Sequence, residues 1–299
     1  MLNFLPTPII LFFSLLFYAL NTLIWLLPIL LFSFLKALLP ITGWQKLMSY
    51  LLDAMASNWV AVNSIIQDLF TVVNYQQTGI EKLDINDWYL VVSNHQSWVD
   101  ILVLQRVLHG KIPFLKFFLK KELIYVPFLG LAWWALDFPF MKRFSGEFLA
   151  KNPHLKGKDI ETTRKACEKF KHKPVSVMNF LEGTRFTASK QQKQGAEFNH
   201  LLKPKAGGIA FVLDAMRDHL TTIVNVTIDY PQGIPSFIDF VQGEVKQVNV
   251  IVETIPIDEK ISGDYFNDAQ YKAGFQQWVN QLWCAKDQQL AEMRSEDKK

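Results

Sequence analysis

The sequence is poor in cysteine, and its first 35 residues contain no charged side chain. The two cysteines, Cys167 and Cys284, form no Cys-x-x-Cys or Cys/His metal pattern, and two are too few for a disulfide-dense scaffold. Free thiols in a reducing compartment are the simplest interpretation. The first charged residue is Lys36. An uncharged run of this length is unusual for a core helix of a soluble protein.

Three common catalytic or nucleotide-binding motifs are also missing from the sequence. It contains no Gly-x-Ser-x-Gly elbow, which disfavours a serine hydrolase built on that turn. It contains neither a phosphate-binding P-loop nor a His-Glu-x-x-His zinc motif. The formal net charge of +3 is small, so the overall charge gives no reason to expect a nucleic-acid partner.

The apolar run over residues 8–35 is longer than an upright membrane span requires. As one helix it would extend about 42 Å at about 1.5 Å per residue, whereas the hydrocarbon core of a bilayer is about 30 Å thick. We therefore expect it to tilt, to kink at Pro28 or to break near Asn21 into a re-entrant hairpin. A cleavable signal peptide fits poorly because no basic residue precedes the run. The first positive charges, Lys36 and Lys46, predict that the following domain faces the cytoplasm.

Residues 44–74 carry an amphipathic helical pattern. Their apolar residues recur at helical spacing with charged residues between them. Such a helix either lies in the membrane interface, with Trp44 and Trp59 at headgroup depth, or packs onto a globular domain. The uncharged neighbouring segment favours the interface. We therefore divide the chain into membrane-embedded and interfacial helices (residues 1–75) and a globular domain with a C-terminal helix (residues 76–299).

Short apolar runs alternate with helical stretches from residue 80 onward, which predicts an α/β domain. Its sheet is expected to be mixed, largely parallel and flanked by helices. The predicted strands are residues 88–93, 175–181 and 223–228. The predicted helices are residues 98–108, 159–170 and 207–219, and the tail from Tyr271. Two further apolar runs within 238–255 are expected to pair at a sheet edge, and 123–136 is either a buried helix or an interfacial segment.

His95 and Asp100 form the first candidate site. Asn94 and His95 directly follow the predicted strand 88–93, and the carboxyl ends of strands are where α/β sheets bind ligands. A carboxylate five residues later can hold one imidazole nitrogen and leave the other to accept a proton, as a general base requires. The alternatives are an ordinary loop histidine and a helix cap made by Ser97 and Asp100.

Two further candidate sites contain arginine. Glu182, Gly183, Thr184 and Arg185 follow the strand 175–181 as His95 follows its strand; the guanidinium suits a phosphate, and a simple turn with a surface ion pair is the alternative. The second site, Phe140-Met141-Lys142-Arg143, opens a segment (142–205) with 15 Lys and Arg against 6 acidic residues. Such a segment predicts an anionic ligand, an anionic membrane surface, or merely a solvated charged face.

These three motifs, in this order, resemble the glycerophospholipid acyltransferase family, which includes the 1-acyl-sn-glycerol-3-phosphate acyltransferases. Asn94, His95 and Asp100 match the family's NHxxxxD motif, Phe140 and Arg143 match a Phe-x-x-Arg motif, and residues 182–185 match its EGTR motif. The resemblance spans about residues 80–230 and is greatest to a bacterial inner-membrane branch. It implies an O-acyltransferase of phospholipid biosynthesis or remodelling at the bacterial inner membrane, with the active site facing the cytoplasm.

The resemblance also implies roles for these residues. His95 takes the proton from a lysophospholipid hydroxyl, Asp100 orients His95, and the acceptor site is formed by Lys142, Arg143, Glu182, Gly183, Thr184 and Arg185. The donor is acyl-CoA or acyl carrier protein, the acceptor is 1-acyl-sn-glycerol-3-phosphate, and neither metal nor cofactor is required. The membrane lipid is the other partner. Another acceptor such as lysophosphatidylglycerol, a hydrolase that transfers the acyl group to water, and a catalytically silent lipid-binding protein are the alternatives.

Overall fold

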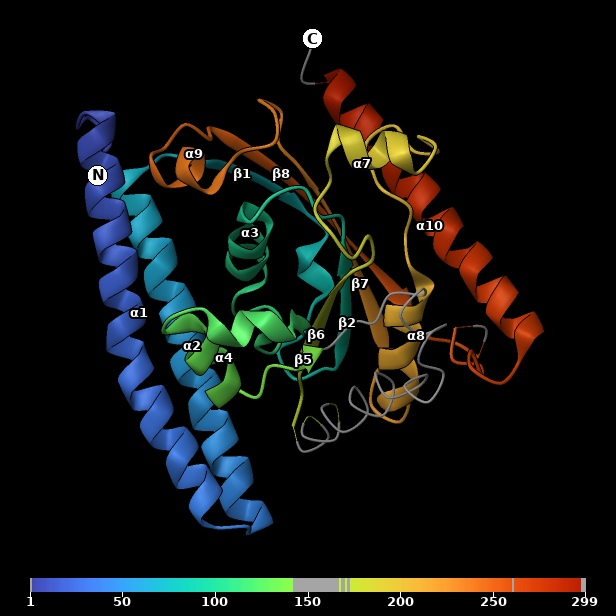
Figure 1. The fold of residues 1–299 in the computed structure, drawn as a ribbon, viewed down its shortest axis with the longest axis horizontal. Coiled ribbons are helices and arrows are strands. Elements are labelled where there is room, and N and C mark those ends of the chain that lie inside the picture. Colours follow the sequence, from blue (N-terminus) through green and yellow to red (C-terminus); the bar gives the residue numbers. More distant parts are fainter. Residues whose placement is uncertain (1, 142–166, 168–169, 171–172, 260, 297–299) are drawn as a thin grey trace.

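The computed structural model describes residues 2–141, 167, 170, 173–259 and 261–296. The chain begins with two long antiparallel helices, α1 (Thr7–Leu38) and α2 (Thr42–Phe70), which lie along one side of the remaining domain (Figure 1). We call this pair the hairpin. Helix α1 is unbroken and contains Pro28. Asn21 is buried and donates from its amide to the Trp59 carbonyl (3.0 Å) and to Asn63 Oδ1 (2.8 Å) of α2. The helix therefore has no break near Asn21, and this residue instead joins the two helices.

Helix α1 is apolar on both its packed and its open side. Among the described residues it is the helix that is long and apolar enough to cross a membrane. Large apolar side chains such as Phe12, Ile24 and Leu27 are exposed on it, and a contiguous surface of this kind is rare on soluble proteins. Helix α2 buries one face, including Leu52 and Val60. Helix α2 therefore packs onto the rest of the protein, which is one of the two interpretations of its amphipathic pattern.

The main sheet has six strands in the described residues: β1 (Asn74–Thr78), β2 (Tyr89–Ser93), β3 (Leu115–Phe117), β6 (Ser176–Phe180), β7 (Thr222–Asp229) and β8 (Gln247–Pro256). They lie in the order β1-β8-β7-β2-β6-β3. All neighbours are parallel except β7 and β8. The central strand β2 is buried throughout because it lies between β6 and β7 and has a layer on each face. A separate pair is formed by β4 (Leu119–Lys120) and β5 (Phe140–Met141).

Helices cover both faces of the sheet. On one face, Val91 of β2 packs in a core with α3 (Val99–Leu108) and residues of the hairpin. On the other, Leu90 and Val92 pack in a core with α8 (Ala206–Ala215) and the long α10 (Ala269–Glu296), so that α10 and the hairpin lie on opposite sides (Figure 1). The shorter helices are η1 (Ile80–Lys82), η2 (Lys121–Tyr125), α4 (Leu129–Ala135), α7 (Ala188–Lys193) and α9 (Phe237–Val241).

The predicted architecture is confirmed as a largely parallel sheet flanked by helices. The three predicted strands are found as β2, β6 and β7, and the helices predicted over 98–108 and 207–219 are α3 and α8, although α8 ends earlier, at Ala215. The C-terminal helix is α10. The helix predicted over 159–170 lies outside the described residues except for Cys167 and Phe170.

The prediction for residues 238–255 is wrong. The first apolar run is part of helix α9, because Ser236 and Asp239 form a capping box that starts a helix there. The second run is β8, which lies between β1 and β7 rather than at an edge. Periodicity alone does not distinguish a short apolar helix from a strand, and here the two polar cap residues decide the structure.

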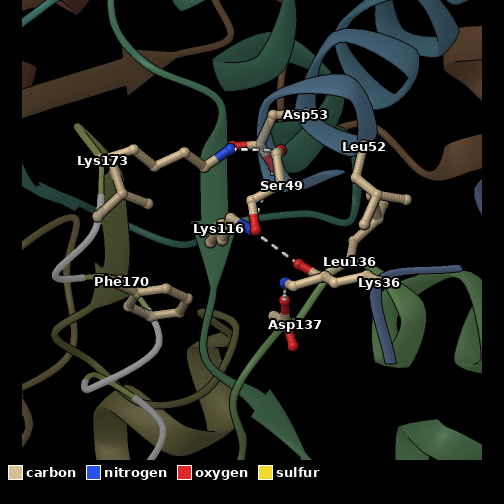
Figure 2. A pocket seen from close by; sticks show the side chains of 10 residues that line it. Lys36, Ser49, Leu52, Asp53, Lys116, Leu136, Asp137, Phe170 and Lys173 are labelled. Carbon is tan, nitrogen blue, oxygen red and sulfur yellow. Dashed lines mark hydrogen bonds and ion pairs between the residues drawn. The ribbon is translucent and has the colours of Figure 1, made fainter. Parts of the chain in front are cut away.

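A group of buried and half-buried charges joins the hairpin to the domain (Figure 2). We call Lys36, Asp53, Lys116, Asp137 and Lys173 the hairpin cluster. Asp53 of α2 pairs with Lys173 and, at 3.2 Å, with Lys116 of β3, and Lys36 of α1 pairs with Asp137. Burial lowers the pKa of Lys173 to about 8, although Asp53 counteracts this shift. Because each charge has a partner, the cluster fixes the hairpin against the amino-end side of β3 and β6.

Candidate functional site

The loop after β2 is fixed to the neighbouring strand by Asn94. Its amide donates to the Ile228 carbonyl of β7 (2.8 Å), and its side-chain oxygen accepts from the Ile228 N–H (2.9 Å). The Gln96 amide donates to the same carbonyl (2.7 Å). The Asn94 side chain therefore bonds to both the N–H and the C=O of Ile228, as a paired strand would, and extends the pairing with β7 beyond the end of β2. His95 is therefore held at a fixed place at the carboxyl edge of the sheet.

Asp100 holds the His95 ring and the loop at once. Its Oδ2 accepts from His95 Nδ1 (2.9 Å) and from the backbone N–H groups of Gln96 (2.6 Å) and Ser97 (2.8 Å). Its Oδ1 accepts from the Tyr230 hydroxyl (2.7 Å), and its side chain is fully buried. One carboxylate therefore holds both the imidazole ring and the loop that leads into α3.

The geometry leaves the second imidazole nitrogen as the acceptor. An ionised carboxylate only accepts hydrogen bonds, so His95 Nδ1 carries the proton and Nε2 has the free lone pair in the neutral ring. The ring stacks on Phe180 with centroids 3.8 Å apart. It is 13% exposed and lines a pocket of about 260 Å³. This arrangement can remove a proton from a group bound in the pocket.

The pocket combines an apolar wall with a polar side. Aromatic and aliphatic residues from the start of α3, the segment from β3 to η2, and β6 form the wall, and most of the polar groups come from His95, Lys120 and the turn after β6. The His95 ring touches the apolar wall, since it stacks on Phe180, and the mixed lining suits a ligand that is partly apolar and partly charged. The remaining lining residues are Trp98, Ile101, Phe117, Phe118, Leu119, Leu123, Met178, Asn179, Phe180, Gly183, Thr184 and Arg185.

Glu182 lies behind the pocket rather than in its lining. Its side chain is fully buried, Oε1 accepts from the His95 N–H (3.0 Å) and Oε2 from the Leu202 N–H (3.1 Å). Burial raises the pKa of Glu182 to about 8, against the effect of these two hydrogen bonds. Glu182 thus joins the turn after β6 to the His95 loop and shapes the site from behind.

Gly183, Thr184 and Arg185 do reach the pocket. Gly183 has φ 69°, a conformation that glycine adopts without strain, and this turns the chain toward His95. The Arg185 guanidinium lies over the Trp98 ring, 4.8 Å from its centroid. The structure therefore brings together His95, Asp100 and this turn, as the sequence predicted. Lys142 and Arg143 lie outside the described residues; the chain is described as far as Met141, and Phe140 pairs with the pocket residue Leu119.

Several contributing residues were not found from the sequence. Lys190 of α7 donates to Thr184 Oγ1 and to the Arg185 carbonyl, both at 2.8 Å, and so holds the turn. Tyr230 directly follows β7, and this position was a usable signal because His95 and Glu182 each lie two residues after the end of a neighbouring strand, β2 or β6. Lys120 lies in a strand of two residues, which is too short to show a pattern.

The C-terminal helix α10 also supports the site from outside the pocket. Buried Lys286 donates to the Val226 carbonyl (2.6 Å) and to Thr227 Oγ1 (2.8 Å), and burial lowers its pKa to about 7. Arg294 Nε donates to Asp229 Oδ1 (2.7 Å) at the end of β7. The helix is therefore bonded along β7, the strand to which Asn94 attaches the His95 loop.

The comparisons with known proteins agree with this picture. A family model described as "Acyltransferase" matches residues 74–229. The chain is 25% identical over 224 residues to 1-acyl-sn-glycerol-3-phosphate acyltransferase 3 of Arabidopsis thaliana, covering 70% of this chain and 54% of that protein. It is 22% identical over 255 residues to lysocardiolipin acyltransferase 1 of Danio rerio, covering 81% of this chain and 61% of that protein. The chain thus spans about half the length of the curated relatives it matches.

The structure search gives the same fold. The crystal structure of the 1-acyl-sn-glycerophosphate acyltransferase PlsC from Thermotoga maritima matches with a TM-score of 0.57 and 15% sequence identity. The match covers 97% of this chain and 98% of that one. At this identity the likeness establishes the shared fold, including the helices before the sheet.

Proposed function

The chain belongs to the acyltransferase family, and from that premise we propose that it acylates the free hydroxyl of a lysophospholipid. The proposed acceptor is 1-acyl-sn-glycerol-3-phosphate, and the donor is the thioester of acyl-CoA or acyl carrier protein. The observation that carries the proposal is the His95–Asp100 pair in a pocket shared with Thr184 and Arg185. The names of the curated relatives support this acceptor class.

The reaction follows from the position of the free His95 nitrogen. Nε2 removes the proton from the acceptor hydroxyl, whose oxygen then attacks the thioester carbonyl carbon. The new C–O bond forms, the C–S bond breaks, and the proton passes from His95 to the departing thiolate. Asp100 keeps Nδ1 protonated and stabilises the imidazolium that forms between the two steps. All atoms and charges balance without an acyl-enzyme.

Positive charge at the pocket supports a phosphorylated acceptor. Arg185 offers a planar fork suited to phosphate, and Lys120 adds a second cation on the pocket wall. Lys142 and Arg143 are proposed to complete this site. Lys190 holds the turn that presents Arg185. The apolar wall, including Phe117 and Leu123, is proposed to take the acyl part of the substrates.

The protein is proposed to work at the bacterial inner membrane with its pocket toward the cytoplasm. The exposed apolar surface of α1 supports membrane association. Lys36 and Lys46 follow the apolar run and support the cytoplasmic side. We propose that residues 1–75, which contain the hairpin, attach the protein to the membrane and that residues 76–299 form the catalytic domain.

A panel of acceptors tests the proposal. The protein, purified in detergent, is given labelled acyl-CoA or acyl carrier protein with lysophosphatidic acid, lysophosphatidylglycerol or lysophosphatidylcholine. We expect phosphatidic acid as the main product. Product from lysophosphatidylglycerol alone would overturn the acceptor. Release of free fatty acid without a diacyl product would favour a hydrolase, and no reaction with any acceptor would favour a silent lipid-binding protein.

A further inference from the structure

A second exposed apolar surface lies on the segment between β4 and β5. Its members are Tyr125 (80% exposed), Phe128 (57%), Leu131 (46%) and Trp134 (57%). We call these four residues the η2–α4 patch. They recur every three residues, which places the helical members toward one side of α4. This stretch was expected to be either a buried helix or an interfacial segment, and the structure gives it one buried side and one exposed side.

The local sequence forces these side chains outward. A Cβ on Gly130 would lie 2.1 Å from the Ile124 carbonyl oxygen, so glycine alone permits α4 to pack this closely on η2. The inner side of α4 is filled by the small residues Ala132 and Ala135, both buried. Phe128 has φ 62°, which is strained for a non-glycine residue. The aromatic side chains thus remain on the outer side of a tightly packed element.

The patch lies on an element that packs directly against the hairpin. Helix α1 packs against α4, and the Lys36–Asp137 pair joins their ends. The carboxyl-terminal part of α1 also exposes large apolar side chains, including Phe34 and Leu38. Two neighbouring elements therefore present apolar surface to the same surroundings, and a bilayer is the partner that can cover both.

The composition and charge of the segment match the interfacial region of an anionic bilayer. Tyrosine and tryptophan prefer headgroup depth because their rings are apolar and their polar atoms stay wet. Lys120 and Lys121 are exposed next to the patch, and cations there are attracted by anionic headgroups. Lys120 and Leu123 also line the pocket, so the patch borders the pocket wall.

We propose that the η2–α4 patch inserts into the headgroup region of an anionic bilayer, as a membrane contact distinct from α1. It holds the Lys120–Leu123 side of the pocket at the bilayer surface, where a lipid acceptor enters from the membrane. The part concerning the acceptor rests on the proposed function. The insertion itself does not, and it is tested separately.

Insertion is measured with a fluorescent reporter. Leu131→Cys is labelled with an environment-sensitive NBD group in a Cys284→Ser background, since Cys284 is exposed and Cys167 is buried. Ile85→Cys, an exposed apolar position before β2, is the matched control. In vesicles of phosphatidylcholine containing phosphatidylglycerol, the label at 131 is expected to shift to the blue and to be quenched by spin-labelled lipid. The proposal is overturned if the label at 131 behaves like the label at 85. It is also overturned if the emission of the label at 131 shifts only when the protein concentration is raised and not when vesicles are added.

The effect on acceptor entry is measured with a Tyr125→Gln, Phe128→Asn and Trp134→Gln triple variant, and Ile85→Gln is its control. Activity on long-chain acceptor in these vesicles is expected to fall roughly tenfold, because burial of large side chains in the interface is lost. Activity on a short-chain, water-soluble acceptor is expected to stay unchanged. An equal fall on both acceptors overturns the entry role. No wild-type activity on either refutes the proposed function and leaves the insertion result standing.

Discussion

At the residue scale, Asp100 determines the geometry of the site because four hydrogen-bond donors meet on one buried carboxylate. We expect Asp100→Asn to lower kcat roughly 10³-fold or more, since an amide cannot accept from all of these donors and no longer fixes the His95 tautomer. Tyr230→Phe removes one donor and keeps the carboxylate. It should lower kcat far less and cost about 1–3 kcal/mol of stability. Steady-state kinetics and thermal unfolding distinguish the two; similar losses of kcat would contradict the orienting role.

Glu182 predicts a pH dependence of stability. Its pKa in the folded protein is raised to about 8 from an ordinary value of 4.5, so the folded state holds the proton more tightly than the unfolded state. The stabilising contribution is therefore present below about pH 4.5 and is lost as pH rises through about 8. Glu182→Gln does not titrate. The stability advantage of wild type over this variant should shrink from pH 5 to 8; a difference that is independent of pH would contradict the buried, proton-holding carboxyl.

The sequence located the central pair of the site but not its supports. His95 and Asp100 are five residues apart, so one loop brings them together and their spacing is informative. Tyr230 and Lys190 reach the same site from other elements, and only the strand order β7-β2-β6 places Tyr230 beside Asp100. Long-range contacts of this kind depend on the order of strands in the sheet, which no local pattern encodes.

At the element scale, the hairpin cluster predicts how firmly α2 is attached to the sheet. Asp53→Ala would leave two lysines, Lys116 and Lys173, buried without their acidic partner. We expect a loss of roughly 3–5 kcal/mol of unfolding free energy. Asp68→Ala is the matched control, because Asp68 is 56% exposed and pairs with Arg106 near the surface; its cost should be below about 1 kcal/mol. Denaturant unfolding in detergent measures both, and equal costs would contradict a buried attachment.

Elements with strong patterns were predictable, whereas short ones were not. The strands β2 and β6 are buried runs of apolar residues, and their bounds differ from the predicted ones by one residue at most at each end. Strand β3 has three residues and β4 two, fewer than a period-2 pattern needs to be recognised. Strand β1 is polar and mostly exposed at the sheet edge, so it lacks the apolar alternation that reveals a half-buried strand.

At the scale of the whole molecule, the proposed orientation predicts which side of the membrane α10 occupies. Cys284 is exposed on α10 and provides a native label site. A membrane-impermeant maleimide should modify it in inverted inner-membrane vesicles and not in intact spheroplasts. Cys284→Ser is the control for labelling elsewhere. Modification in spheroplasts alone would place the domain on the opposite side and contradict the cytoplasmic assignment.

The fold could be predicted at this scale because strand and helix alternation specifies an α/β architecture, whereas the attachment of the hairpin could not. The sequence showed that residues 8–35 are apolar. It gave no sign that Asn21 bonds to α2 or that Asp53 pairs with two lysines of the domain. The curated relatives extend beyond the matched region, so the catalytic proposal rests on the shared region and on the geometry of its pocket.

The most direct test of the proposed mechanism is acyl transfer to lysophosphatidic acid by His95→Ala, with His109→Ala as the control. His109 lies at the end of α3, bonds to Ser57 and does not line the pocket. We expect His95→Ala to lower kcat by about 10²–10⁴, the usual contribution of a general base, while both variants still unfold in a cooperative thermal transition, which shows that they remain folded. Full activity of a folded His95→Ala protein would contradict the proposed mechanism.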